Sequence, residues 1–348
     1  RIAWVTGGSL LGDLDHEAMA FGLVTTAGTV SHTGVAGLTL GGGFGRLARR
    51  FGLALDNVRG VELVTAEGKL VRAYPDENPD LYWAVRGGGG NFGVATNFEF
   101  GLHPMDRTVI AGGLVYPIAE ARQVMNVYAE YAATAPDELY VDCGLFSQGE
   151  QAGLTMEVCY SGDPRLADRL LAPLRQAGTV VADTVGPQDY VAVQKSGDIS
   201  DPRARGSYLK SGFVDELTPK MIDVLVDGFQ PHPGRGMFVG FQHSGGAIGR
   251  VASDATAFAH REVRHDSLFV THWAMGDDPT EHIRYLREYF ASYAPYTIGF
   301  YTNDVSLDDS QQAINRNYAG NFARLAELKK RYDPTNLFRL NANVAPAA

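Results

Sequence analysis

One glycine-rich stretch decides the fold: Gly34-Val35-Ala36-Gly37-Leu38-Thr39-Leu40-Gly41-Gly42-Gly43-Phe44-Gly45. A second cluster follows at Gly87-Gly88-Gly89-Gly90-Asn91-Phe92-Gly93. Glycines at this density let the backbone reach positive φ and approach a bulky ligand, and their free N–H groups can cradle an anion such as a pyrophosphate. Tight turning between packed strands is the alternative explanation for a single cluster. Two clusters in one small region favour a nucleotide cofactor.

The fingerprint of NAD(P)-binding Rossmann domains is the obvious rival, because residues 43–48 and 88–93 both satisfy it. The surrounding sequence argues against both matches. After Gly93 the residues alternate as a strand where the fingerprint requires a helix. After Ala48 the helix is short, and no acidic residue closes a second parallel strand. A Rossmann dehydrogenase is therefore a disfavoured alternative.

Length and charge narrow the class of protein. The chain has 348 residues, which suits two domains, since single cores stop growing at roughly 250 to 300 residues. Its net charge of −10 would repel a phosphate backbone, so nucleic acid is not an expected partner. Cys143 and Cys159 lack metal-ligand spacing and are too few for a disulfide framework, so we expect two buried thiols.

No apolar run approaches the roughly 20 residues of a membrane span, and no signal peptide opens the chain. We therefore expect no membrane association, and a soluble, cytoplasmic protein is slightly favoured. Residues 1–5 resemble a strand already under way, so we expect a lost upstream segment and an exposed strand edge that destabilises the chain on its own. The sequence does not indicate the oligomeric state.

The composition changes near residues 102–104, from glycine-dense strands to ordinary strands and helices, and we place a domain boundary there. The elements expected beyond it are a helix at 120–133, a hairpin of 139–146 and 154–160, strands at 179–185, 237–243 and 267–273, helices after the N-caps Asp163, Thr218 and Asp278, and a long helix through 314–328. Hairpins and helices without strict alternation predict an α+β fold, with an antiparallel sheet covered by helices on one face.

Four motifs in order resemble the berberine-bridge-enzyme-like branch of the FAD-linked oxidases, in the vanillyl-alcohol-oxidase superfamily. They are the stretch 33–45, Phe51-Gly52-Leu53-Ala54-Leu55-Asp56-Asn57-Val58, the run from Asp80 to Val94 that contains Trp83-Ala84-Val85-Arg86-Gly87-Gly88, and the tail Tyr332-Asp333-Pro334-Thr335-Asn336-Leu337-Phe338-Arg339-Leu340-Asn341. The resemblance extends from residue 1 to about Val344. It identifies the chain as most of such an oxidase, without the first part of the flavin-binding domain.

The resemblance implies a division into three parts and a cofactor, FAD. Residues 1–105 would form part of a PCMH-type α+β FAD-binding domain, 106–305 an antiparallel-sheet substrate domain, and 306–348 a segment returning to the FAD domain. The implied cofactor-binding residues are Gly28, Thr29, Val30, Ser31, His32, Thr33, Gly34, Gly37, Gly42, Gly43, Gly45, Gly93, Val94, Asn303, Asn341 and Asn343. A structural role is the alternative for His32.

Two departures from the family concern flavin attachment. The family's anchoring histidine lies in a segment that would precede Arg1, and Val30 occupies the position of a second, cysteine anchor in some members. We therefore expect a non-covalent flavin, whose binding is weakened by the absence of the upstream segment.

The resemblance also indicates where the chemistry takes place. Residues 300–304 match the family's Tyr-x-Asn stretch, and Asp304 occupies the position where some members carry a tyrosine base. A carboxylate with a raised pKa could do this work, and Tyr301 is the second acid–base candidate. The residues Ser267, Phe269 and Thr271 share one strand face and line either the substrate site or a structural face of the sheet.

These features favour a flavin-dependent oxidoreductase that takes a hydride from a C–H bond of a small alcohol, amine or sugar-like substrate, with oxygen as acceptor. The sequence cannot separate an oxidase from a dehydrogenase that uses another acceptor. A non-catalytic fragment or binding protein without a functional flavin site is the alternative from another class. A metal site at Glu262-x-x-His265 is not expected, because the stretch resembles a strand and no helix presents two ligands together.

Overall fold

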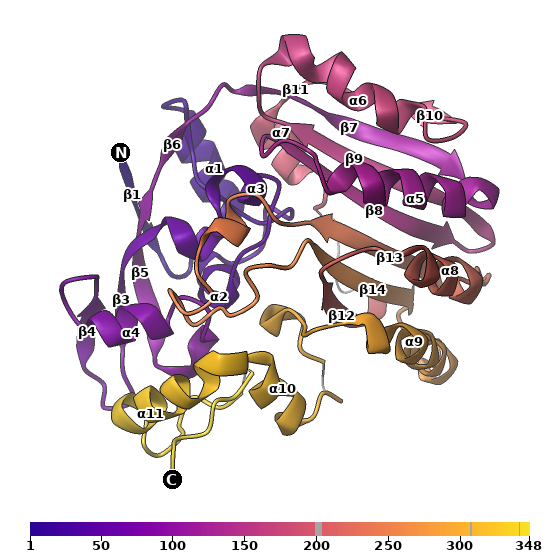
Figure 1. The fold of residues 1–348 in the computed structure, drawn as a ribbon. Helices are drawn as coiled ribbons and strands as arrows, with labels where there is room; N and C mark the ends of the chain where they lie inside the picture. Colours follow the sequence, from indigo (N-terminus) through magenta and orange to yellow (C-terminus); the bar gives the residue numbers. More distant parts are fainter. Residues whose placement is uncertain (199–203, 307, 341) are drawn as a thin grey trace.

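The computed structural model describes residues 1–198, 204–306, 308–340 and 342–348. Figure 1 shows two regions side by side, with the N-terminal strands and the C-terminal tail on one side and a large sheet with its helices on the other. The first region contains a four-stranded antiparallel sheet in the order β1 (Ile2–Thr6), β5 (Val94–Gly101), β3 (Val58–Val64) and β4 (Leu70–Ala73). Its other elements are α1 (Leu11–Met19), α2 (Val35–Gly41), α3 (Ala48–Phe51), α4 (Pro79–Ala84) and the pair β2 (Leu23–Val24) and β6 (His103–Pro104).

The second region is built on an eight-stranded sheet whose neighbouring strands all run antiparallel. Its order is β10 (Ala182–Asp183), β7 (Thr108–Pro117), β9 (Gln151–Tyr160), β8 (Leu139–Gln148), β13 (Gly236–His243), β14 (His265–Ala274) and β12 (Arg205–Val214), and β11 (Gly186–Asp189) also pairs with β7. The predicted antiparallel sheet is therefore confirmed.

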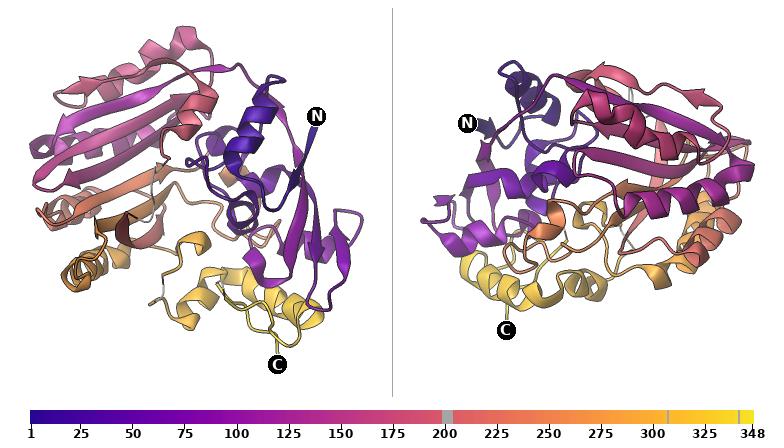
Figure 2. Two further views of the ribbon diagram at one scale, coloured as in Figure 1. Left: turned by 180° about the vertical axis from the view of Figure 1, so that it is seen from behind. Right: turned by 45° about the horizontal axis from the view of Figure 1, so that its top comes forward.

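Helices cover one face of this sheet, as predicted (Figure 2). These helices are α5 (Ala121–Ala132), α6 (Ala167–Arg175), α8 (Pro219–Gly228) and α9 (Thr280–Tyr293), and the short α7 (Tyr190–Lys195) lies between β11 and the first region. Side chains alternate along each strand, so Cys143 of β8, Phe241 of β13 and Phe269 of β14 enter one apolar core with these helices. The opposite face of the sheet turns toward the first region.

Two of the three predicted polar N-caps are confirmed. Asp163 accepts a hydrogen bond from the Arg165 N–H, and Thr218 accepts one from the Met221 N–H at the start of α8. Asp278 is not the N-cap of α9, because the helix begins one residue later than predicted and its N-cap is Pro279, although Asp278 still accepts from the Thr280 N–H.

Two expectations about single elements are wrong, and two long strands were missed. The strand expected at 179–185 contains only β10, because the chain leaves the sheet edge before β11. The strands β7 and β12 were not expected at all. The tail helix is divided into α10 (Gln311–Asn317) and α11 (Phe322–Tyr332), since Ala319 has φ +46° between them.

The tail packs on the first region rather than on the large sheet. Leu325 and Leu328 of α11 share an apolar cluster with Leu81, Phe92 and Phe98. The turn that follows α11 is closed by Asp333, which accepts hydrogen bonds from the N–H groups of the two residues at 337 and 338. This places residues 301–306, which precede α10, at the junction of the two regions.

Two smaller apolar clusters join the regions, one around Tyr140 and Tyr190 and one around Phe44, Phe213 and Phe258. Both cysteines are buried and unpaired, as expected. Over the described ranges, no helix combines the length and apolar character needed to cross a membrane. Within the same ranges no cluster of three or more histidine, cysteine, aspartate or glutamate side chains could hold a metal ion.

Candidate active site

A row of polar side chains crosses the face of the large sheet that has no covering helices. Asp142 of β8 lies opposite Glu157 of β9, and Gln242 of β13 lies opposite Asp266 of β14. The two pairs belong to one row. Cys143 of β8 is paired with Phe241 of β13, so Asp142 and Gln242, one position further along, lie side by side. The His243 N–H also donates to Asp142. Side chains at paired positions point to the same face, so these four polar groups all face the first region.

The strand face that the sequence suggested for substrate contacts is the helix-covered face, opposite the polar row. Ser267, Phe269 and Thr271 are completely buried beneath the helices. The Ser267 hydroxyl donates to the Gly212 carbonyl, and the Thr271 hydroxyl donates to the Gly236 carbonyl at 3.3 Å. Phe269 stacks against three aromatic rings of α9. The expectation that they line the substrate site is corrected, because they fill the sheet's core.

A cavity of about 170 Å³ lies against the polar row. Gly144 and Gly240, which are paired on adjacent strands in the neighbouring row, line this cavity and make room for the Phe238 ring. Phe238 forms one wall, since its ring would lie 2.5–2.6 Å from a Cβ at either glycine. Thr29 is the residue of the first region that lines this cavity among those the structure describes. Its lining is Thr29, Asp142, Gly144, Thr155, Glu157, Phe238, Gly240, Phe241, Gln242 and Leu268.

Several glycines on either side of α2 are needed for packing. A Cβ on Gly45 would lie 1.7 Å from the Ala27 carbonyl, and one on Gly43, where φ is +90°, would lie 2.3 Å from Ala54. A Cβ on Gly42 would meet Tyr301 at 3.0 Å, and one on Gly28 would meet Leu38 at 2.6 Å. These four positions therefore have a structural explanation in addition to any contact with a cofactor.

Gly34 and Gly37 differ from them. No described atom lies within 4 Å of a Cβ built on either residue. Gly37 lines a second cavity, of about 340 Å³, together with Gly89 and Gly90 of the second glycine cluster. Asn91, Thr302, Asn303, Tyr318, Leu340 and Ala342 also line this cavity. The chain from Thr29 to Gly37 thus borders both cavities, one at each end.

The other residues expected around the cofactor are spread more widely. Val30 and Thr33 are half-buried, Ser31 is buried, and His32 is exposed, with its Nδ1 3.3 Å from an Asp198 carboxylate oxygen. Gly93 and Val94 lie at the start of β5, where a Cβ on Gly93 would come within 2.5 Å of the Val64 carbonyl. Asn341 lies outside the described residues. Asn343 is half-buried, and its backbone carbonyl accepts from Gln311.

The Tyr-x-Asn stretch is a turn followed by a short 3₁₀ segment, not a strand. Tyr301 is 7% exposed, and its oxygen accepts hydrogen bonds from the Gly43 N–H at 2.8 Å and from Asn303 Nδ2 at 2.7 Å. Burial raises the pKa of Tyr301 above its ordinary value. This environment holds the phenol in its neutral form and gives it a structural role beside the glycine loop. Asn303 instead faces the second cavity.

Asp304 and Asp266 are two carboxyl groups whose charges oppose each other. Burial raises the pKa of Asp304 to about 7. Burial, followed by the negative charges of Asp304 and Asp142, raises the pKa of Asp266 well above its ordinary value. Ionising one of these groups opposes ionising the other, because like charges disfavour each other. This pair brings a residue expected from sequence together with one that was not expected.

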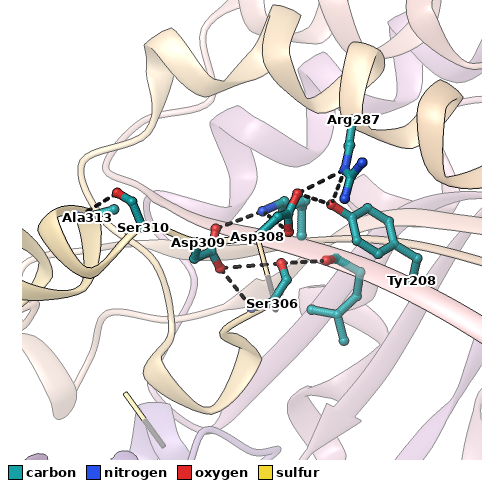
Figure 3. Close-up of polar contacts among 9 residues, drawn as sticks. Tyr208, Arg287, Ser306, Asp308, Asp309, Ser310 and Ala313 are labelled. Atoms are coloured by element: carbon teal, nitrogen blue, oxygen red, sulfur yellow. Dashed lines mark hydrogen bonds and ion pairs between the residues drawn. The ribbon is translucent and has the colours of Figure 1, made fainter. Parts of the chain in front are cut away.

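The segment that follows Asp304 is fastened to the large sheet (Figure 3). Asp309 accepts hydrogen bonds from the Ser306 N–H and from Lys210 Nζ, at 2.8 Å and 2.7 Å. Asp308 accepts from the Tyr208 hydroxyl at 2.7 Å and from Arg287 Nε at 2.9 Å. These contacts come from β12 and α9, and they fix the end of the turn that carries Asp304.

Sequence reasoning missed the polar row. The hairpin of β8 and β9 was expected with alternating faces, and within that alternation Asp142 and Glu157 are charged residues at positions between apolar ones. A charged residue at the same phase of two neighbouring strands is the signal that could have found the row. Gln242 and Asp266 extend it only through the pairing of strands that are far apart in sequence.

Comparisons with known proteins agree with this geometry. A family model for an FAD binding domain matches residues 1–74, and one described as berberine and berberine like matches residues 301–345. An FAD-linked oxidoreductase of Dictyostelium discoideum is 33% identical over 346 residues, which cover 98% of this chain and 75% of that protein. Glucooligosaccharide oxidase of Sarocladium strictum is 26% identical over 385 residues, covering 100% of this chain and 75% of that protein.

The similarity extends to a solved structure. The 6-hydroxy-D-nicotine oxidase of Arthrobacter nicotinovorans has a TM-score of 0.85 and 28% identity, covering 99% of this chain and 79% of that chain. FAD as the cofactor and oxidoreduction as the general class of reaction, both expected from sequence, are thereby confirmed. The chain belongs to the berberine-bridge-enzyme-like family of FAD-linked oxidoreductases and is an FAD-dependent enzyme.

Proposed function

We propose that this enzyme takes a hydride from a C–H bond of a small alcohol, amine or sugar-like substrate, and that oxygen then accepts the electrons. The substrate occupies the cavity on the polar row, and Asp304 serves as the base. The observation that carries the proposal is the cavity itself, which Asp142 and Glu157 of the polar row line together with Thr29 of the first region. Asp304 is the candidate base because it occupies the position where some family members carry a tyrosine base.

The residues present fit an FAD molecule. Gly37, Gly89 and Gly90 line the 340 Å³ cavity. A Cβ built on Gly37 or on Gly89 would meet no described atom within 4 Å. Their backbones can therefore approach a flat or charged ligand closely. Asn303 of the same cavity supplies a side-chain amide, and residues 28–34 would lie along the ring system. When bound, FAD supplies the acceptor for the hydride.

The polar row and Asp304 would divide the remaining work. Carboxyl and amide groups of Asp142, Gln242 and Glu157 accept hydrogen bonds from substrate hydroxyl or amino groups and orient the reacting C–H bond. With a pKa of about 7, Asp304 is substantially ionised at neutral pH, and its carboxylate oxygen accepts the hydroxyl or amine proton as the hydride leaves. Asp266 keeps its own proton and thereby limits the negative charge around the base.

The experiment is an anaerobic substrate screen. The FAD-loaded protein is mixed with panels of primary and secondary amines, alcohols and reducing sugars, and bleaching of the flavin absorbance is followed in a stopped-flow instrument. We expect one panel to bleach the flavin and the others to leave it oxidised. An oxidised flavin with every panel would contradict the proposed reaction, even if FAD binds.

The acceptor is tested separately. Admitting air to the bleached protein should restore the yellow colour and release one hydrogen peroxide per substrate, measured with a peroxidase-coupled dye. A flavin that stays reduced in air and reoxidises with an artificial quinone would assign a dehydrogenase instead.

A further inference from the structure

The loop that borders the substrate cavity is held by a segment of the other region. Residues 194–198 comprise the last two residues of α7 and the three that follow it, and they lie against residues 28–32. Gln194 Nε2 donates to the Gly28 carbonyl at 2.9 Å. Asp198 accepts from the Ser31 N–H at 2.7 Å and from the Ser31 hydroxyl at 2.6 Å. The two segments approach so closely that a Cβ on Gly197 would lie 2.8 Å from the Thr29 carbonyl.

Arg46 completes this contact from within the first region. One guanidinium nitrogen, Nη1, donates to the Thr29 carbonyl at 3.2 Å and to Gln194 Oε1 at 3.1 Å. The other, Nη2, donates to the Ser196 hydroxyl at 3.3 Å. Arg46 is 6% exposed and Gln194 is 1% exposed, so water cannot easily replace either partner.

Arg46 also reaches the opposite wall of the cavity. Its Nη2 lies 3.6 Å from a carboxylate oxygen of Glu157, a member of the polar row. Thr29 and Glu157 both line the 170 Å³ cavity, one from each region. The guanidinium therefore spans the junction at one end of the cavity and touches both of its walls.

The charges around Arg46 support a fixed geometry. Asp15 of α1 is 2% exposed, and its Oδ2 accepts from Gln194 Nε2 at 3.1 Å. Burial raises the pKa of Asp15 to about 7, against the opposing effects of the Gln194 hydrogen bond and the Arg46 charge. Gln194 thus donates to two elements of the first region, to Asp15 of α1 and to Gly28 of the loop. A side chain with so many buried partners has one conformation available to it.

We propose that Arg46 and Gln194 are positioning residues, which hold loop 28–32 at the cavity so that the large-sheet region sets the distance between the flavin loop and the polar row. The effect of this positioning on catalysis rests on the proposed function. The contact itself does not depend on that function. Neither residue touches the reacting atoms.

The test measures the loop directly. Amide hydrogen exchange is followed by mass spectrometry in peptides covering residues 27–34, in the parent protein and in Gln194→Met, without substrate. Methionine keeps the length of the side chain and removes both hydrogen-bonding atoms. We expect exchange in this loop to become roughly tenfold faster while peptides of the sheet core keep the parent rate. Arg122→Lys, which alters exposed ion pairs to Asp223 and Asp227 on the helices, is the matched control and should leave the loop unchanged.

Two further readouts separate positioning from general stability. Arg46→Ala should show the same faster exchange, and guanidinium added below denaturing concentration should restore the protection in this variant but not in Gln194→Met. The dissociation constant for FAD, measured by quenching of flavin fluorescence, should rise in both variants. Loop exchange at the parent rate, or an equal acceleration across the whole chain, would overturn the proposal. These exchange data stand whether or not the screen finds a substrate, so the two proposals fail separately.

Discussion

The two faces of the large sheet are built from the same strands and have opposite character. On β14, Phe269 and Thr271 enter a closed core, whereas Asp266 and Leu268 face the first region. In the core the polar atoms of Ser267 and Thr271 have carbonyl partners. On the open face Asp266 Oδ1 is buried without a hydrogen-bond partner among the described residues. One step along a strand therefore separates a satisfied group from an unsatisfied one.

This difference shows where the molecule retains unfavourable interactions. A buried carboxyl without a partner costs free energy, and natural cores rarely contain one. The open face contains Asp142 and Asp266, both with raised pKa values, and Asp304 lies opposite them. Groups with pKa values shifted by burial cluster at functional sites. The contrast between the faces is thus a contrast between stability and chemistry, and single substitutions can test it.

The largest effect is expected at the carboxyl pair. Asp304→Asn keeps the shape of the side chain and removes its ability to accept a proton. The rate of flavin reduction by the substrate found in the screen should fall by about 10²- to 10⁴-fold. FAD affinity should stay at the parent value. Stopped-flow reduction under anaerobic conditions measures the rate, and fluorescence titration measures the affinity.

Tyr301→Phe and Glu216→Gln provide the comparison for this variant. Glu216 is exposed and should have no effect. The loss of the Tyr301 hydroxyl removes the acceptor of two hydrogen bonds and should act mainly through FAD binding. A large loss of reduction rate in Tyr301→Phe with a parent-like Asp304→Asn would move the base to the phenol.

The second prediction concerns the core face. Phe269→Ala removes a completely buried ring that packs against three aromatic residues and should lower the free energy of unfolding by about 3–5 kcal/mol. Leu268→Ala, one residue away on the open face, should cost less because its side chain borders an existing cavity. Urea unfolding followed by circular dichroism gives both values. Equal losses at the two positions would contradict the assignment of the faces.

Sequence predicted the general arrangement of this sheet but not its phase. The hairpin of β8 and β9 was predictable because its apolar residues alternate over ten positions and a short turn joins them. The phase of β14 was not predictable, because apolar side chains occur at both parities of 265–274. Only pairing with β12 and β13, which are distant in sequence, determines that Ser267 faces the helices.

The glycine clusters show the same limit. Their density indicates a close backbone approach, but it does not tell whether the approaching group is a ligand or the protein itself. Gly45 is required by the Ala27 carbonyl, whereas Gly37 opens into a cavity. Only the packing of residues far apart in sequence separates the two cases.

The third prediction is a pH dependence of stability that comes from the open face. Burial raises the pKa of Asp142 to about 7 in the folded protein, against 3.8 as its ordinary value. Between these values the folded state holds a proton that the unfolded state has lost, so stability falls as the pH rises through this window. For one such group the slope reaches about 1.4 kcal/mol per pH unit.

Asp142→Asn should flatten this dependence in urea unfolding between about pH 4 and pH 7, because it removes one titrating group. Asp308→Asn should remove a contribution to stability that has the opposite pH dependence. Although burial alone would raise the pKa of Asp308, hydrogen bonds from Tyr208 and Lys210 lower it below the ordinary value. Its contribution is therefore lost as the pH falls through the acid range. An unchanged slope in Asp142→Asn would show that the carboxyl is hydrated in the folded protein.

The smallest effects come from one substitution made on both faces. Thr271→Val removes a buried hydroxyl that donates to the Gly236 carbonyl in the core, and it should cost about 1 kcal/mol of stability without altering kcat or KM. Thr155→Val removes a half-buried hydroxyl from the wall of the cavity, and it should leave stability within about 0.5 kcal/mol while raising KM. The chemical change is identical, so any difference comes from the face alone. Urea unfolding and steady-state kinetics of both variants measure it, and a raised KM in Thr271→Val with none in Thr155→Val would place the substrate on the helix-covered side of the sheet.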